Sequence, residues 1–174
     1  MRLDRLPPGT SVGPASPSPG ALLAVDTVRR YADVTRTPLR TVGVPTGWEH
    51  LNVHPSTGPG PADLTVEGAA VPGTPPYRLA HRLAWLAGTP VEAAIEELAR
   101  WQSLVAGWAE EPSRPICAGV QEDLLAALRD LDTEAAVAVL RGSLDLGLPA
   151  GCLFETWAWA DRLLGLDLAV LVGF

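Results

Sequence analysis

Lysine is absent from the sequence, and all 13 basic residues are arginine. A phosphate-binding loop of the form G-x-x-x-x-G-K-S/T, which needs its lysine, is therefore excluded. The 20 acidic residues outnumber the basic ones and give a formal charge of −7. Because an acidic chain lacks the broad basic face that captures nucleic acid by counterion release, we expect no tight unaided binding of RNA. A local patch of arginines stays open as an alternative.

Cysteine and histidine are scarce, which limits metal and thiol chemistry. The two cysteines, Cys117 and Cys152, lie far apart, without C-x-x-C spacing or a neighbouring histidine. We expect both to be buried apolar thiols in a reducing compartment. His50 and His54 stand four residues apart, but the proline that follows disfavours a helix and no third ligand is nearby. No metal site is therefore expected.

Long apolar segments and hydrolase motifs are also missing. No apolar stretch is long enough to span a bilayer, and one of the longest, Leu163–Phe174, is interrupted by Asp167. Residues 1–19 are rich in proline and have no apolar segment of the kind found in signal peptides. No G-x-S-x-G sequence is present, so nothing supports serine hydrolase chemistry. We therefore predict a cytoplasmic protein that does not enter a membrane.

The composition that remains is that of a globular chain, with 47% hydrophobic and 19% charged residues among 174. In residues 1–76 a short strand ending at Pro14 is followed by a loop, a helix over Ala21–Val34 and a strand over Pro38–Pro45. This order is half of a nucleotide-binding α/β unit. Such units hold a phosphate where a glycine-rich loop opens into a helix.

Two further features belong to this N-terminal half. The helix carries apolar residues at three-residue steps on one face, whereas Asp26, Arg29 and Arg30 lie off that face. A second short strand is expected at Leu64–Gly68.

Residues 77–174 are predicted to form five helices joined by short loops, which favours a compact antiparallel bundle. The first of these helices is expected to start near Pro76 and to end at Gly88, and the second to run from a capping box at Thr89–Glu92 to Trp108. The third is expected over Val120–Leu131, the fourth starts at a cap formed by Asp132 or Thr133, and the last runs from about Pro149 to a stop at Gly165. His81 is expected to face solvent from the first helix. Five tryptophans are expected in the core or at its edge, namely Trp85, Trp101, Trp108, Trp157 and Trp159.

The predicted fold class is therefore a predominantly helical α/β protein. Residues 1–76 would form an α/β fragment, a reduced Rossmann-like unit, and residues 77–174 an all-α helical bundle.

The strand–helix–strand segment resembles the first crossover of class I aminoacyl-tRNA synthetases, and cysteinyl-tRNA synthetase most closely. In that family a strand ending C-G-P leads to an H-I-G-H loop, a helix ending F-D-x-L-R-R-Y and a strand ending N-I-T-D. Here Val12-Gly13-Pro14 is similar to the first strand end, Val25–Tyr31 to the helix, and Val44-Pro45-Thr46 to the second strand end. The chain also resembles mycothiol ligase, which is similar to that enzyme.

The resemblance continues in order along the chain. Leu64–Gly68 is similar to the L-T-V-x-G segment before the family's K-M-S-K-S loop, and Tyr77–Leu83 to the helix after that loop. Leu128–Leu140 and Trp159–Asp167 resemble two helices of the helical domain beyond the catalytic core. Each match is short, and their common order carries the resemblance.

The family's catalytic signatures are missing from this chain. Ala15–Gly20 stands in place of the H-I-G-H loop without a histidine, and Ala70–Thr74 in place of K-M-S-K-S without a cation. Val12 stands where the family has a zinc-binding cysteine. Because such donors stabilise charge on the reacting phosphates, their loss implies a site without catalysis.

The resemblance implies four remnants of nucleotide contacts, Gly13, Pro14, Gly20 and Thr46, and no catalytic or metal-ligating residue. The favoured hypothesis is a cysteinyl-tRNA synthetase-like paralogue with a lost active site, a non-catalytic binding or regulatory module whose helical bundle docks a protein or tRNA. A second is a nucleotide-binding enzyme of altered activity that takes ATP or another adenine nucleotide. A third is an orphan helical bundle without a ligand. No cofactor is predicted, and the oligomeric state stays open.

Overall fold

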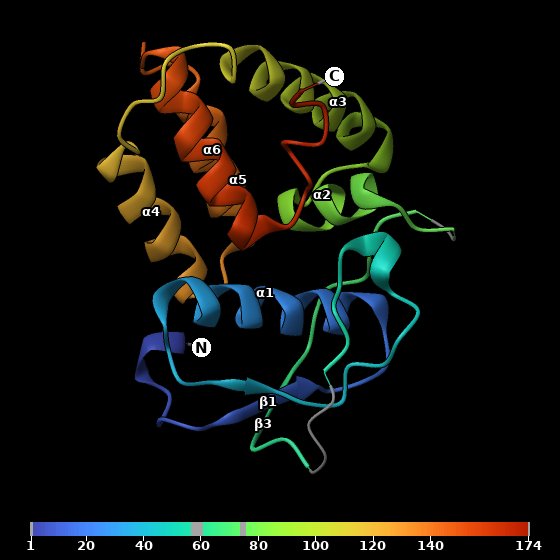
Figure 1. Cartoon of the computed structure of the whole chain (residues 1–174). Coiled ribbons are helices and arrows are strands. Elements are labelled where there is room, and N and C mark those ends of the chain that lie inside the picture. The colour runs from blue at the N-terminus through green and yellow to red at the C-terminus, as the bar shows by residue number, and fades with distance from the viewer. Residues whose placement is uncertain (1, 57–60, 74–75, 174) are drawn as a thin grey trace.

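The computed structural model describes residues 2–56, 61–73 and 76–173, and within them the chain is a mostly helical α/β protein (Figure 1). In chain order its elements are the 3₁₀ helix η1 (Leu3–Arg5), strand β1 (Ser11–Pro14), helix α1 (Pro19–Thr35), strand β2 (Arg40–Thr41), the 3₁₀ helix η2 (Glu49–Leu51), strand β3 (Leu64–Val66), and helices α2 (Leu79–Ala87), α3 (Val91–Trp108), α4 (Ala118–Arg129), α5 (Thr133–Ser143) and α6 (Ala150–Leu164). Thr74, which ends the segment compared with K-M-S-K-S, lies outside the described residues.

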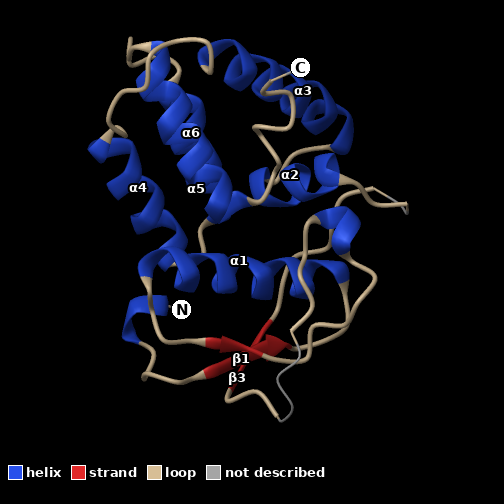
Figure 2. Cartoon of the chain, viewed as in Figure 1, coloured by secondary structure: helices blue, strands red, loops and turns tan. Residues whose placement is uncertain are grey.

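The three strands form a parallel sheet in the order β2-β1-β3 (Figure 2). The register pairs Ser11 with Arg40 and Val12 with Thr41 on one side of β1, and Val12 with Leu64, Gly13 with Thr65 and Pro14 with Val66 on the other. Parallel neighbours need a crossover, and α1 supplies it between β1 and β2. Strand β2 is shorter than the predicted Pro38–Pro45, because Gly43 has a positive φ of 71° and Pro45 has no N–H for a ladder.

Helix α1 lies between the sheet and the other helices (Figure 1). It begins slightly earlier than predicted, with Pro19 at its first position and Ser18 as N-cap; Ser18 Oγ accepts a hydrogen bond from Ala21 N at 3.3 Å. Contacts with the sheet on one side and with α4 and α6 on the other bury most of its length. Its burial includes Asp26, which is 2% exposed although the sequence placed it off the apolar face.

All five predicted C-terminal helices are present, but the first starts later than expected. Helix α2 begins at Leu79 and not near Pro76, because the backbone of Arg78 is extended, with φ −141° and ψ 175°. His81 Nδ1 accepts a hydrogen bond from Arg78 N at 2.9 Å, which closes the first turn. His81 is 9% exposed, so the expectation that it faces solvent is wrong.

The capping box predicted at Thr89–Glu92 is also wrong. Pro90 is the N-cap of α3, and no side chain caps that helix. Thr89 N donates to Ala84 O at 3.0 Å and so completes the end of α2. Of the two N-cap candidates for α5, Asp132 and Thr133, Asp132 is the N-cap, because its side chain accepts a hydrogen bond from Ala135 N. Local sequence spacing therefore misassigned one cap and correctly indicated the other.

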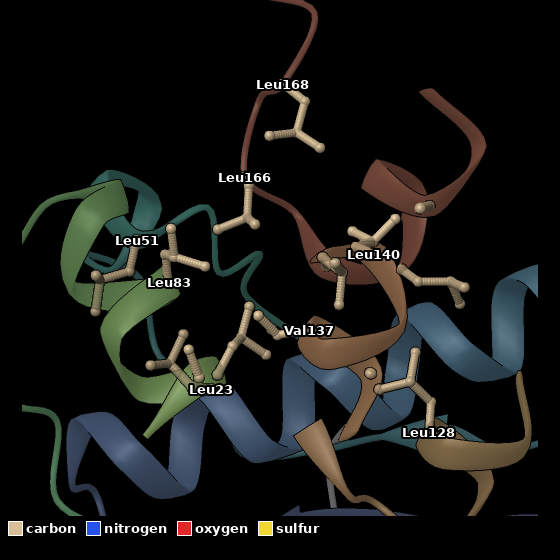
Figure 3. Close-up of a cluster of buried hydrophobic side chains, with 14 of the residues drawn as sticks. Leu23, Leu51, Leu83, Leu128, Val137, Leu140, Leu166 and Leu168 are labelled. Atoms are coloured by element: carbon tan, nitrogen blue, oxygen red, sulfur yellow. The ribbon is translucent and has the colours of Figure 1, made fainter. Parts of the chain in front are cut away.

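One hydrophobic core runs through the described residues. Side chains of α1, η2, α2, α4, α5 and the segment after α6 gather in it (Figure 3). Trp101 and Trp157 are fully buried and meet edge to face, with ring centroids 5.0 Å apart. Trp85, Trp108 and Trp159 are partly buried against this core. The prediction that these tryptophans serve packing is confirmed.

The core continues across the predicted boundary between residues 1–76 and 77–174. Helix α1 packs directly on α4 and α6, and η2 packs on α2. The division into two domains stays a prediction. None of the helices in the described ranges combines the length and the apolar composition that crossing a bilayer requires.

Candidate functional site

The four predicted remnants of nucleotide contacts lie in three settings. Gly13 and Pro14 belong to β1, Gly20 to the first turn of α1, and Thr46 to an exposed loop after β2. Gly13 is buried between the flanking strands, where a Cβ would lie 3.1 Å from Val42 O. The structure therefore gives Gly13 a role in close packing of the sheet.

The N-terminus of α1 is closed by the protein itself. Gly20 packs against the backbone that follows β3, and a Cβ at this position would overlap the carbonyl of Ala69. Ala69 O is held there because it accepts a hydrogen bond from Trp85 Nε1 at 3.1 Å. A carbonyl oxygen repels an anion, so Ala69 O disfavours a phosphate beside Gly20.

Proline and the N-cap reduce the number of N–H groups that the first turn of α1 could offer to an anion. Pro19 has no N–H, Ala21 N donates to Ser18 Oγ at 3.3 Å, and Leu22 N donates to Ser18 O at 3.1 Å. Phosphate sites at helix N-termini depend on such free donors. In the first turn of α1, Gly20 N is therefore the N–H group for which the described residues show no acceptor.

A buried charged cluster, defined by Asp26, Arg29, Arg30 and Arg82, joins the two halves. Asp26 Oδ2 lies 2.8 Å from Arg82 Nη2 and 2.7 Å from Arg30 Nε, and its Oδ1 lies 2.8 Å from Arg29 Nη2. Burial alone would raise the pKa of Asp26, but the charges of Arg82 and Arg30 outweigh it and hold that pKa well below its usual range. Asp26 is therefore a carboxylate inside the protein.

Arg82 uses its remaining donors on backbone carbonyls. Its Nη1 donates to Leu51 O at 3.0 Å, and its Nε donates to Leu164 O at the end of α6. Burial lowers the pKa of Arg82, and the neighbouring Asp26 opposes that shift. Because Arg82 contacts α1, η2 and α6 from α2, we assign the cluster a structural role. In the sequence, the only signal for this cluster was the position of Asp26, an acidic residue within an apolar segment.

A groove lies between η2, the start of α2 and α3. The segment after β2 supplies Trp48 and His50, and the segment after β3 leads to Tyr77 and Arg78. The groove is concave and mostly apolar, with a few polar side chains, which makes it the candidate binding site of the described residues.

The groove, here called the α2–α3 groove, has a volume of about 470 Å³. It is lined by His50, Arg78, Leu79, Ala80, His81, Ile95, Leu98, Ala99 and Gln102. A second depression of about 310 Å³ shares His50 with it and is lined by Trp48, Pro76 and Tyr77. This site was not expected from the sequence. Its one signal there was Ile95, a large apolar residue of α3 that is exposed in the structure.

Two predictions, on metal ligands and on the cysteines, concern side chains in the described ranges. No three His, Cys, Asp or Glu side chains are grouped there in a way that could hold a metal ion. Cys152 is buried as expected, whereas Cys117 is half-buried, and both thiols are free. The expectation of no metal site stays a prediction.

Comparisons of the chain with family models, with curated proteins and with solved structures gave no match. The resemblance to class I synthetases therefore rests on the residues quoted above.

Proposed function

We propose that this chain is a degenerate relative of the class I synthetases, closest to cysteinyl-tRNA synthetase and mycothiol ligase. In this proposal β1, α1 and β2 are a reduced Rossmann-like unit, and residues 77–174 correspond to the helical domain. Two observations support it: α1 connects parallel strands, as in the family's first crossover, and helices follow where the resemblance implies them.

The proposed protein does not activate an amino acid. The start of α1 supports this proposal, because Ala69 O packs on Gly20, Pro19 has no N–H, and Ala21 N donates to Ser18 Oγ. An adenylate-forming enzyme must instead stabilise negative charge on phosphates at that end of the helix. We therefore propose a non-catalytic binding or regulatory module.

We favour a protein or small-molecule ligand over tRNA. Seven of the 13 arginines form ion pairs with carboxylates of the same chain, namely Arg2, Arg29, Arg30, Arg82, Arg100, Arg129 and Arg141. With a formal charge of −7, few cations remain for phosphate contacts.

Cysteine-dependent exchange between ATP and pyrophosphate tests this proposal, with a catalytically competent cysteinyl-tRNA synthetase as positive control. We expect a rate equal to that without enzyme. Exchange well above that blank would contradict it. Saturable ATP binding without exchange would favour the alternative of a nucleotide-binding enzyme with altered activity.

A further inference from the structure

The α2–α3 groove combines three features that together define a ligand class, and none depends on whether the chain activates an amino acid. The first is size. A volume of about 470 Å³ falls within the range of sites for small organic molecules, which is about 300–1,000 Å³. The adjoining depression extends the site past His50 toward Trp48 and Tyr77.

The second feature is a series of aromatic rings beside an apolar floor. Trp48 stacks on Tyr77 with ring centroids 6.5 Å apart, and it lies 5.7 Å from the ring of His50. Tyr77 meets His81 edge to face at 5.4 Å. Trp48 and Tyr77 are half-buried and His50 is exposed, so these three rings offer faces and edges to a flat ring of a ligand.

The floor of the groove is aliphatic. Leu79 and Leu98 line it, and Ile95 leaves 54% of its surface exposed there. A large exposed aliphatic side chain inside a concave site loses contact with water when a ligand binds. The body of the ligand is therefore expected to be apolar.

The third feature is positive charge in an acidic chain. Arg78 is exposed, lines the groove, and forms no ion pair with a carboxylate of the described residues. No Asp or Glu lines the groove in the part of the chain that the structure describes. The nearby Glu49 accepts hydrogen bonds from Gly47 N at 3.1 and 3.2 Å. One free guanidinium matches one carboxylate in bidentate geometry.

His81 holds the start of α2 beside the groove. Its Nδ1 accepts the hydrogen bond from Arg78 N, so in the neutral imidazole the proton is assigned to Nε2. This bond also fixes the ring beside the first turn of α2.

From these features we propose that the α2–α3 groove binds a small aromatic monocarboxylate. Its ring would lie against the Trp48–Tyr77 side and the aliphatic floor, and its carboxylate would pair with Arg78.

Isothermal titration of the full chain with naphthoate tests the proposal, with naphthalenemethanol and cyclohexanecarboxylate as matched probes that lack the charge or the aromatic ring. We expect saturable naphthoate binding at one site and weaker binding of both other probes. No saturable naphthoate binding, or equal affinity for naphthalenemethanol, would overturn the proposal.

Substitutions locate the site. Arg78→Gln should weaken naphthoate binding about tenfold or more, whereas Arg100→Gln, at an exposed arginine outside the groove, should leave it unchanged. Ile95→Glu should weaken it as well, whereas Leu146→Glu, at an aliphatic residue that is 58% exposed elsewhere, should not. Circular dichroism melting curves check that each variant is folded.

Two results would assign the groove to another occupant. If Arg78→Gln and Ile95→Glu, both folded, bind naphthoate as the unmodified chain does, the carboxylate site is elsewhere. If the chain dimerises in sedimentation, Ile95→Glu dissociates the dimer and naphthoate does not bind, the groove holds a second copy. Either result overturns the proposal.

Discussion

At the scale of single residues, one buried acid joins the two halves of the chain. Asp26 of α1 and Arg82 of α2 are both fully buried, and their side chains lie 2.8 Å apart. Arg82 also donates to carbonyls of Leu51 and Leu164, so its charge is compensated from three directions. Breaking a buried pair is costly, because the remaining groups lose their partners in a medium of low polarity.

We therefore expect Arg82→Met to lower the free energy of unfolding by about 3–5 kcal/mol, measured by urea denaturation. Arg100→Met is the matched control. The Arg100 side chain is 64% exposed, and its replacement should change stability by no more than about 0.5 kcal/mol. Equal losses in the two variants would contradict the role assigned to Arg82.

Asp26 also predicts how stability depends on acid. Its folded-state pKa lies below the unfolded value of about 3.9, because Arg82 and Arg30 outweigh the effect of burial. The stabilisation it provides is therefore fully present above the unfolded pKa and is lost as the pH falls through the folded pKa. Unfolding free energies measured below about pH 4 should fall less steeply for Asp26→Asn than for the unmodified chain. Parallel curves would show that Asp26 has no such shift.

At the scale of elements, the start of α1 decides what the α/β part can do. Gly20 and Gly68 let the helix and the segment after β3 approach closely at their backbones, since a Cβ at either glycine would overlap the other segment. In nucleotide-binding folds a glycine at this place lets a phosphate approach. In this chain, Gly20 instead lets the carbonyl group of Ala69 approach the helix.

Gly20→Ala should accordingly destabilise the fold by about 1–3 kcal/mol, because the added methyl group cannot be accommodated without moving the backbone. Gly107→Ala in α3 provides the control. Nothing lies within 4 Å of a Cβ at Gly107, so alanine should stabilise the helix by about 0.5–1 kcal/mol. Thermal denaturation of both variants measures the difference. A stabilised Gly20→Ala would mean that the N-terminus of α1 is open.

Helix periodicity and glycine ends were readable from the sequence, because they depend on neighbours along the chain. The five C-terminal helices and the end of α6 at Gly165 follow from such local signals. Contacts between distant segments were not readable. The burial of His81 depends on the extended Arg78, and the failure of the Thr89 cap depends on how α2 ends.

At the scale of the whole molecule, the sheet and the helices share one core through α1. The proposals concern two places in this molecule, the start of α1 and the α2–α3 groove. The first was expected to be inactive from the missing signature loops. The second could not be predicted, because His50, Arg78 and Gln102 line one groove only when η2, α2 and α3 are packed.

We infer that the start of α1 does not accept a nucleotide phosphate. Titration of the full chain with ATP, followed by the amide NMR signals of Gly20, Ala21 and Leu22, tests it most directly. We expect these signals to stay in place over the titration, because Ala21 N is bonded to Ser18 Oγ and Ala69 O packs on Gly20. Saturable shifts clustered at Gly20–Leu22 would contradict it.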